Sequence, residues 1–576
     1  MSNTVEETRA RRVDEVSIAT TQARTRNRSV STKWLLVAAG IVLLGAVLRL
    51  VWMMTQAPVI NSDGGEYARM AEHLRQDHAL IGNFEGPEIL YGPLFPILTA
   101  GVMTVVPDSE TAAHVVSLLS GVALIVLSLL TANYVYGRRT ATICACLVAI
   151  HPLLVALSGS VYNETLYLTL WMGLLYCSVR LIDRWRLRDG LLLGTFAGLA
   201  YLTRIETVAY FLLALLAALA IAASKKRVRS AMAASAAAIV AFGILASPYV
   251  LFLQRHTGHL VLEAKWDINY TMARNRLAGM NPIEADYGVG RGLAAKGPLL
   301  DPFAFSSFTP YTQSFREEIG TLWGMAWRNA RSVYEDLTAR EFGPPLLSGL
   351  ILLAWFARPW SNRRLRHEVL LLLLAGALVF VVLTSATAEF RYMFPLLPML
   401  LLWSAKGVDV LVQTVGRWEL FIRGKPHSPP MALTAGLAAC ALLLVSGLAF
   451  LPVRSCWLFK YQRSSTATAV RSAGIWLAQH DPGPKRIATQ LTVLPYYAKG
   501  TLKAMPYGDP DAAEQYLLKQ KVDYVVLDSD EARAFPNVSA WLEHGLRDPT
   551  ASRIYEYTDG HDTRVVIYRM HHDASL

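Results

Sequence analysis

Long uninterrupted runs of apolar residues limit most strongly what this chain can fold into. The runs extend over roughly 18 to 23 positions, the length of an α-helix that crosses the hydrocarbon core of a bilayer. Of the 576 residues, 53% are hydrophobic and only 17% are charged, whereas a soluble globular chain of this size needs more charged surface. The sequence therefore predicts an all-α polytopic membrane protein.

The apolar segments predict about eleven transmembrane helices. They lie at residues 34–54, 112–134, 141–157, 163–182, 189–203, 206–223, 231–253, 345–358, 367–384, 392–412 and 431–452. The fifth and eighth segments are short, so an even number of spans remains open. We expect residues 34–452 to form one transmembrane domain.

The positions of the basic residues predict the orientation of these helices. Lys and Arg cluster in four short loops, at residues 138–139, 180–188, 225–229 and 358–366, and in the polar tail 1–33. Because cytoplasmic loops carry the excess of Lys and Arg, the loops and the disordered tail are expected inside. The same distribution explains the net charge of +11, so nucleic acid is not an expected partner.

This orientation places three longer segments outside the membrane. Residues 55–111 are acidic, and residues 254–344 are rich in Trp, Tyr, Arg and Pro. A long loop without structure is uncommon in a compact protein, so residues 254–344 are expected to carry helices that lie along the membrane.

The third outer segment, residues 453–576, is expected to form a small soluble α/β domain. Its pattern predicts helices at 467–480 and 511–521 and strands at 485–490, 522–528 and 563–570. No glycine-rich phosphate loop precedes a helix in this segment, so we assign it no nucleotide chemistry.

Two acids follow the first predicted span in the stretch NSDGGEYARMAEHL, residues 61–74. Asp63 could be a helix N-cap, with Glu66 completing a capping box three residues later. Tyr67 then begins an apolar face that suits a helix lying on the bilayer. The acidic excess of residues 55–111 is not needed for a cap, so catalysis by Asp63 stays open as well.

Charged residues also mark the outer ends of other predicted spans. Arg204 and Glu206 interrupt an apolar stretch with almost no loop around them; charges at that depth are usually retained for a site or a buried ion pair. Arg49 and Glu164 are further candidates; alternatively, Arg49 could merely extend its charge to the membrane surface, and Glu164 could lie among the lipid headgroups. The last candidates are Arg391 and Tyr392, which follow Glu389. Mixed charges on one face suggest a cavity for a phosphate and a polar acceptor. No Cys/His spacing indicates zinc.

Several stretches resemble the bacterial members of glycosyltransferase family 39. They are SDGGEYARMAEHL, YGPLFPILTAGV, YNETLYLTLWMGLLY, GLAYLTRIETVAYFLL and FRYMFPLLPML, within residues 34–412. The family includes protein O-mannosyltransferase-like proteins and the aminoarabinose transferase, all of the GT-C class. The resemblance implies a GT-C-like fold with outward juxtamembrane loops and a soluble outer domain, located in the bacterial plasma (inner) membrane.

The resemblance also implies a function and a site. The donor would be a sugar on polyprenyl phosphate, and the acceptor a hydroxyl of a protein, lipid or glycan on the outer face. Asp63 matches the catalytic acid of the family, and Arg204 and Arg391 fall in its arginine motifs. Many members have a second acid directly after the first. Here Gly64 stands there and Glu66 is the next acid, which leaves the role of Glu66 and any divalent-cation site open.

The chemistry that this donor requires fits the residues. Phosphate is a good leaving group, so no general acid is essential. Transfer needs a base for the acceptor hydroxyl and cations for the phosphate. One base on one face implies a single displacement with inversion. The candidate catalytic residues are Asp63 and Glu66, and the candidate substrate-binding residues are Arg49, Tyr67, Glu164, Arg204, Glu206, Arg391 and Tyr392. The alternatives are a secondary transporter or lipid flippase, whose charges would lie near the midplane, and a structural subunit that anchors the outer domain.

Overall fold

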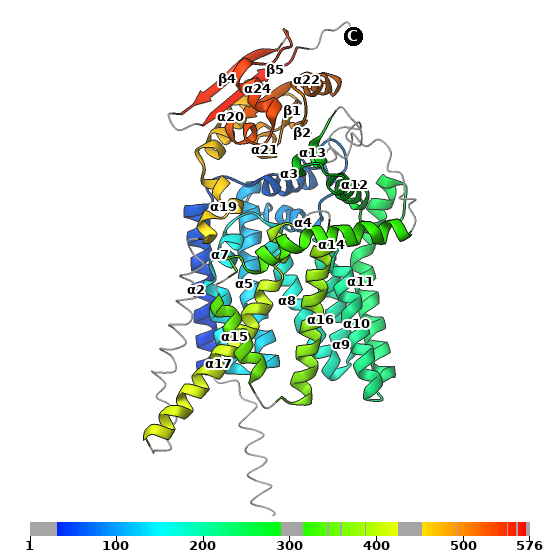
Figure 1. Cartoon of the computed structure of the whole chain (residues 1–576), viewed down its shortest axis with the longest axis vertical. Helices are drawn as coiled ribbons and strands as arrows, with labels where there is room; N and C mark the ends of the chain where they lie inside the picture. Colours follow the sequence, from blue (N-terminus) through cyan, green and yellow to red (C-terminus); the bar gives the residue numbers. More distant parts are fainter. Residues whose placement is uncertain are drawn as a thin grey trace, which may run out of the picture.

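The computed structural model describes residues 32–289, 315–342, 345–357, 360–385, 388–423, 452–490, 492–549, 551–559 and 563–571. Seven helices in this part are long and apolar enough to cross a membrane, and they run lengthwise beside one another (Figure 1). They are α2 (Thr32–Gln56), α5 (Ser109–Val135), α8 (Asn163–Arg184), α10 (Thr207–Ser224), α11 (Val228–Thr257), α16 (Asn362–Thr384) and α17 (Leu396–Arg423). Most of α8 is buried among the others, whereas α2 and α11 expose apolar surface, as expected of lipid-facing helices. The prediction of a polytopic membrane protein is confirmed.

One predicted span is broken. Helices α6 (Arg138–Ile150) and α7 (Pro152–Gly159) meet at an angle of 55° and together occupy the predicted span 141–157. Pro152 is the cause, because it lacks an amide hydrogen and restricts the preceding residue, His151, which adopts an extended conformation.

The expected number of about eleven spans is not confirmed. The described residues contain seven candidates, or eight if α6 and α7 form one span. The predicted spans 189–203 and 345–358 are the shorter helices α9 (Leu187–Tyr201) and α15 (Pro345–Phe356). The last predicted span, 431–452, lies almost wholly outside the described residues.

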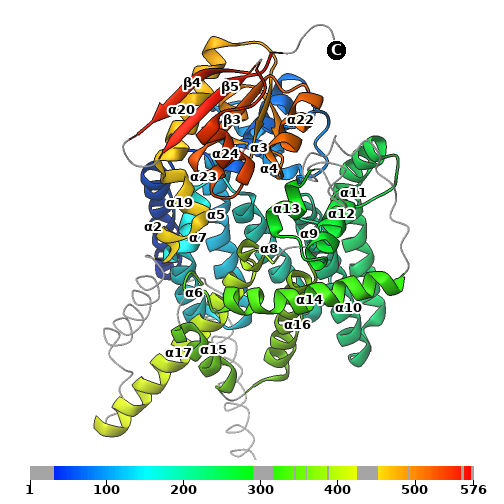
Figure 2. The same ribbon diagram turned by 45° about the horizontal axis from the view of Figure 1, so that its top comes forward.

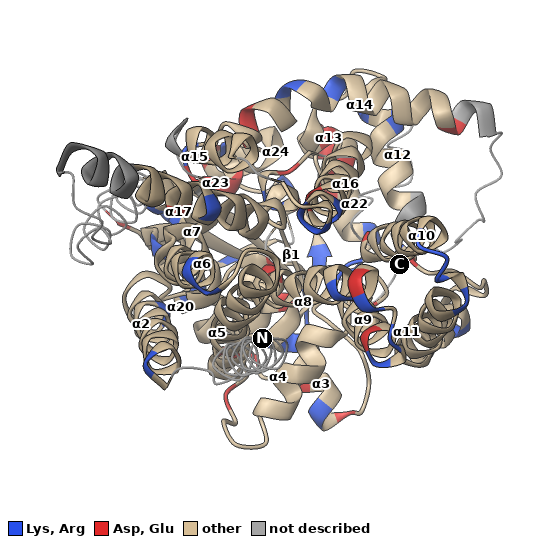
Figure 3. Cartoon of the chain, turned by 90° about the horizontal axis from the view of Figure 1, so that it is seen from below, with Lys and Arg blue, Asp and Glu red and all other residues tan. Residues whose placement is uncertain are grey.

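The basic loops gather at one end of the bundle. Helices α8 and α10 end next to a basic cluster, and α16 begins next to one. All three of these helix ends lie on the side of the bundle away from the C-terminal sheet (Figure 1). Seen from that end, Lys and Arg colour the connections around α6, α9, α11 and α16 (Figure 3). The charge asymmetry that predicted the orientation is therefore also an asymmetry of the folded molecule.

Small residues bring α9 and α11 into close contact. A Cβ atom on Gly190 would lie 2.0 Å from the carbonyl oxygen of Ala234, and one on Gly194 would lie 2.0 Å from that of Ala238. Glycines four residues apart on one helix thus face alanines four residues apart on the other. This spacing allows the two backbones to touch, as in many membrane helix pairs.

A second layer of helices, separate from the spans, lies between the bundle and the sheet. It contains α3 (Ser62–Gln76), α4 (Leu94–Val102), α12 (Trp266–Leu277), α13 (Pro282–Tyr287), α14 (Phe315–Leu337) and the 3-10 turn η2 (Phe390–Met393). Helix α14 runs crosswise to the spans in both views (Figures 1 and 2). Helices were predicted in residues 254–344, and α12, α13 and α14 confirm them in the described part.

The C-terminal region contains a five-stranded sheet with the order β2-β1-β3-β5-β4. Strand β1 is parallel to β2 and β3, whereas β5 is antiparallel to β3 and β4. The predicted elements are confirmed as α20 (Ser465–His480), β1 (Arg486–Thr489), α22 (Pro510–Lys519), β3 (Tyr524–Asp528) and β5 (Arg564–Arg569). The elements that were not predicted are α19 (Trp457–Lys460), η3 (Tyr461–Arg463), α21 (Val493–Ala498), β2 (Thr501–Ala504), α23 (Ser529–Ala532), α24 (Pro536–His544) and β4 (Ser552–Thr558).

Polar contacts dock the sheet region onto the segment between α2 and α5. Lys503 forms an ion pair of 3.0 Å with Glu85, and Lys499 one of 2.8 Å with Glu72 of α3. The Leu502 amide donates a hydrogen bond of 2.6 Å to the Asn83 carbonyl. These contacts place the sheet region on the same side of the bundle as α3. The division of the chain at residue 453 stays a prediction.

The α9–α11 contact yields a stability prediction. We expect Gly194→Ala to lower the unfolding temperature of the purified protein, because the methyl group must push the α11 backbone away, at a cost of about 1–3 kcal/mol. Gly243→Ala, in α11, is the matched control, since no heavy atom lies within 4 Å of a Cβ there. Equal melting temperatures for the two variants would contradict the close contact.

Candidate active site

The site begins at the first turn of α3. Asn61, and not Asp63, is the N-cap: its side-chain oxygen accepts a hydrogen bond of 2.7 Å from the Gly64 amide, and its side-chain nitrogen donates one of 2.6 Å to the Val161 carbonyl. The proposed capping box at Asp63 and Glu66 is therefore wrong. Because Asn61 satisfies the helix end, the carboxylate of Asp63 is available for other contacts.

Asp63 contacts a cation from a distant part of the chain. Its carboxylate forms an ion pair with the guanidinium of Arg391 in η2, and the Tyr91 hydroxyl lies 3.5 Å away. Arg391 is also 2.6 Å from Glu389 and 3.7 Å from Glu164 at the start of α8. Burial disfavours the charge on Arg391, but these carboxylates, Asp63 first, outweigh it and raise the pKa of the guanidinium. Arg391 is therefore a permanent cation.

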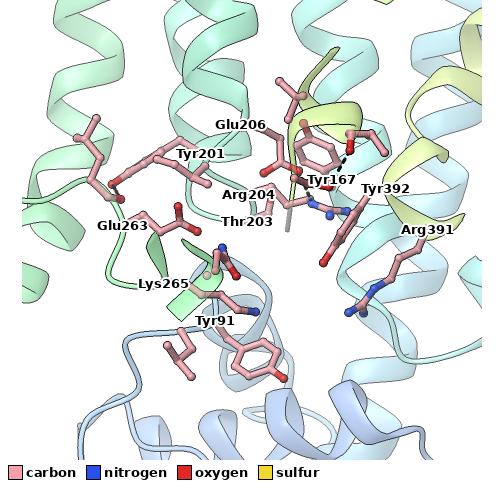
Figure 4. A pocket seen from close by; sticks show the side chains of 18 of the residues that line it. Tyr91, Tyr167, Tyr201, Thr203, Arg204, Glu206, Glu263, Lys265, Arg391 and Tyr392 are labelled. Carbon is pink, nitrogen blue, oxygen red and sulfur yellow. Dashed lines mark hydrogen bonds and ion pairs between the residues drawn. The ribbon is translucent and has the colours of Figure 1, made fainter. Parts of the chain in front are cut away.

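Arg204 is a second buried cation, in the turn between α9 and α10. Its guanidinium is 2.7 Å from the Glu206 carboxylate. The rings of Tyr167 and Tyr392 lie on either side, with centroids 5.4 and 4.9 Å from the guanidinium carbon (Figure 4). Aromatic faces attract a cation most strongly where water is excluded. The aromatic rings and Glu206 thus hold Arg204 in one orientation.

These groups line one cavity of about 530 Å³ at the ends of the spans nearest the C-terminal sheet. Among the predicted site residues it is lined by Asp63, Tyr67, Glu164, Arg204, Glu206, Arg391 and Tyr392. Asp63 and Arg391, which are 328 positions apart, thus meet in one cavity. It contains both signs of charge and many aromatic rings, an arrangement that can hold an anionic head group beside a polar acceptor.

Arg49 lies outside this cavity and does not snorkel. It is fully buried in α2, where it donates hydrogen bonds of 2.9 and 3.1 Å to the carbonyl oxygens of Ala149 and Val148. These carbonyls lie at the C-terminal end of α6, where the break at Pro152 removes their helical partners. Arg49 therefore stabilises the broken span, and we leave it out of the proposed site.

Glu66 also lies outside the cavity. It is fully buried, accepts hydrogen bonds of 2.9 Å from both the backbone and the side chain of Asn83, and shares a hydrogen bond with Glu88. Burial, followed by the charge of Glu88, raises the pKa of Glu66 well above its usual value. A carboxyl in this setting favours its neutral form and holds the loop between α3 and α4 in place, so we propose a positioning role for Glu66.

Gly64 occupies the position where a second acid was expected from the family resemblance. A Cβ atom there would lie 2.8 Å from the Ile60 side chain and 3.0 Å from the Val161 carbonyl oxygen. The glycine is thus required by the close approach of two segments, α3 and the chain before α8.

The cavity also contains residues that the sequence did not single out. Tyr91, Tyr201, Glu263 and Lys265 line it (Figure 4). Burial and the nearby charge of Glu206 raise the pKa of Glu263 to about 7. Glu263 and Lys265 lie in the connection from α11 to α12, whose residues carry no recognisable motif; their proximity to Arg204 follows only from the fold. The described residues contain no group of three or more His, Cys, Asp or Glu side chains that could hold a metal ion.

Residues 90–252 match the family model for dolichyl-phosphate-mannose-protein mannosyltransferases. The chain is similar in structure to ArnT from Cupriavidus metallidurans in its apo crystal form. The alignment covers 94% of this chain and 98% of ArnT, with a TM-score of 0.55 and 14% sequence identity. The chain has the GT-C fold. It is also similar to the oligosaccharyltransferase of Archaeoglobus fulgidus in complex with Zn and sulfate. That alignment covers 91% of this chain and 72% of the oligosaccharyltransferase, with a TM-score of 0.56 and 14% sequence identity. No curated protein gives a significant match.

These similarities confirm the resemblance and the fold class predicted from the sequence. The ArnT structure was also obtained bound to undecaprenyl phosphate; this form covers 93% of the present chain at 13% identity, with a TM-score of 0.52.

The environment of Glu66 leads to a prediction that separates positioning from catalysis. We expect Glu66→Gln to keep most of the activity, because glutamine resembles the neutral acid. Glu66→Ala should lower the stability by about 1–3 kcal/mol, since it leaves buried donors of Asn83 unpaired. Thermal unfolding and turnover are measured for both variants. A Glu66→Gln protein that folds normally but is inactive would restore Glu66 as a catalytic residue.

Proposed function

We propose that this chain is a membrane glycosyltransferase that moves a sugar from a polyprenyl-phosphate donor to an acceptor hydroxyl. The observation that carries the proposal is the Asp63–Arg391 pair in a cavity at the ends of the spans nearest the sheet. It combines a carboxylate that can accept a proton with a cation that can accept a phosphate. The GT-C fold and the mannosyltransferase match over residues 90–252 support it, and the ArnT complex with undecaprenyl phosphate supports the class of donor.

The proposed reaction is a single displacement with inversion. The acceptor oxygen attacks the anomeric carbon on the face opposite the phosphate, and its proton passes to Asp63. The bond between the anomeric carbon and the phosphate oxygen breaks, and its electron pair leaves with the polyprenyl phosphate. Because charge grows on that phosphate, cations are needed beside it; we assign this role to Arg204 and Arg391.

The remaining cavity residues receive binding roles. Tyr67 and Tyr392 present aromatic surface to the sugar, and Glu164 and Glu206 keep the two arginines oriented through the ion pairs of 3.7 and 2.7 Å described above. Held side chains lose little freedom when a ligand binds, which favours binding. The acceptor can be a protein, a lipid or a glycan.

We propose that the reaction takes place on the outer face of a bacterial plasma membrane. The observation that supports this is the position of the basic loops at the end of the bundle opposite the sheet. The N-terminus would then be cytoplasmic, and the C-terminal region extracytoplasmic.

The cavity also bears on the alternative of a secondary transporter or lipid flippase. A transporter typically binds its substrate near the bilayer midplane, whereas Asp63, Arg204 and Arg391 lie in turns and short helices beyond the ends of the spans. Turnover of a polyprenyl-phosphate sugar in detergent distinguishes the two, because transport requires a sealed compartment and transfer does not.

The role of Asp63 is tested by substitution. We expect Asp63→Asn to lower the transfer rate by about 10²–10⁴-fold, the usual contribution of a general base. Asn61 caps the helix, so the change should leave folding intact. The assay incubates purified protein with a panel of polyprenyl-phosphate sugars and an acceptor, and measures the release of polyprenyl phosphate.

Asp77→Asn is the matched control, because Asp77 is exposed at the other end of the same helix. It should leave the rate unchanged. If Asp63→Asn retains more than about a tenth of the wild-type rate, base catalysis cannot be assigned to Asp63.

The proposed orientation predicts the accessibility of two exposed serines. Ser472 lies on α20 of the sheet region, and Ser224 lies at the end of α10 next to a basic loop. In a cysteine-free background, an impermeant thiol reagent on intact cells should label Ser472→Cys and should label Ser224→Cys only after lysis. The reverse pattern would overturn the orientation.

A further inference from the structure

Three basic residues line the cavity, and two of them are already neutralised. Arg391 is paired with Asp63 and Glu389, and Arg204 is paired with Glu206 at 2.7 Å. A phosphate that binds either guanidinium must compete with a carboxylate that is already in place. Each arginine can therefore bind an incoming phosphate only after its carboxylate partner has moved aside.

The third basic residue is Lys265. Within the described part of the chain, its amine forms no ion pair within 4.0 Å. The amine instead lies over an aromatic face, with Nζ 5.6 Å from the centroid of the Tyr91 ring. Figure 4 shows the amine pointing into the same central space as the guanidinium groups of Arg204 and Arg391. Lys265 is thus a cation that faces the cavity with no carboxylate in contact; Glu88, Glu263 and Asp286 act on it only at longer range.

The fold holds Lys265 in this position. It lies directly before α12, and its carbonyl accepts a hydrogen bond of 2.9 Å from the Asn269 amide. The preceding residue, Ala264, is buried, and the Leu262 carbonyl accepts a hydrogen bond of 2.8 Å from the Tyr201 hydroxyl. The backbone on both sides of Lys265 is therefore fixed, while its ammonium can turn on a flexible stem.

We propose that Lys265 binds the phosphate group of the lipid donor and is the residue that captures it first. This inference rests on the proposed transferase function and adds a residue to it. An ammonium with three donors can follow a phosphate as it enters, and here no existing ion pair must be broken. The phosphate then lies in the cavity that Arg391 also lines, where it competes with Asp63 for the guanidinium and so frees Asp63 to accept a proton.

The experiment compares two lipids with the same tail. Undecaprenyl phosphate and undecaprenol are titrated onto the purified full-length protein in detergent, and their dissociation constants are measured for the wild type, Lys265→Gln and Lys265→Met. We expect both variants to bind undecaprenyl phosphate about 10- to 100-fold more weakly, the loss of one charge-assisted hydrogen bond. Binding of undecaprenol should not change. If Lys265 had only a structural role, its loss would weaken the binding of both lipids.

Lys225→Gln is the matched control, because Lys225 is exposed in the connection between α10 and α11 at the opposite end of the bundle. It removes the same charge and should leave both dissociation constants unchanged. Lys265→Met retains the apolar stem over Tyr91, so it supplies the measurement if Lys265→Gln does not fold.

The outcomes separate this inference from the proposed function. If the wild type binds undecaprenyl phosphate no more tightly than undecaprenol, the proposed donor class is wrong. If the wild type prefers the phosphate and a folded Lys265 variant keeps that preference, the function stands and the assignment of Lys265 fails. Equal weakening of both lipids would also overturn it, since the effect would then concern the tail or the fold.

Discussion

Inside a bilayer, backbone N–H and C=O groups have no water to bind, so each must find a partner in the protein. This constraint governs where irregular backbone can occur in this molecule. The one break described inside a span, between α6 and α7, is buried, and Arg49 donates to the carbonyl groups that the break leaves free. The other irregular segments lie beyond the ends of the spans, and it is there that Asp63, Arg204 and Arg391 come together.

Much of the architecture follows from local patterns. Apolar runs predicted the long helices, and the alternation of short helical and strand patterns predicted α20, α22, β1, β3 and β5. The residues of the cavity were recognisable for a related reason. A charge at the boundary of an apolar segment is costly, so Arg204 and Arg391 stood out as residues that the fold must accommodate.

Other features depend on partners that a sequence does not display. Arg49 resembles the cavity arginines in its setting, but its partners are carbonyl groups exposed by a proline 103 residues away. Glu66 follows Asp63 by one helical turn, yet its side chain turns to Asn83, away from the cavity. Lys265 has no apolar context that would mark it. In each case the tertiary contact, and not the local pattern, decides the role.

Gly64 has a consequence for how this protein could change. A second acid at this position is common among the proteins that the sequence resembles, but here a side chain would meet Ile60 and the Val161 carbonyl. A single substitution cannot introduce that acid without separating α3 from the start of α8, the two segments that present Asp63 and Glu164 to Arg391. A route to a paired-acid site therefore passes through a less well-packed intermediate. For an engineer, compensating changes at Ile60 would have to come before the acid at position 64.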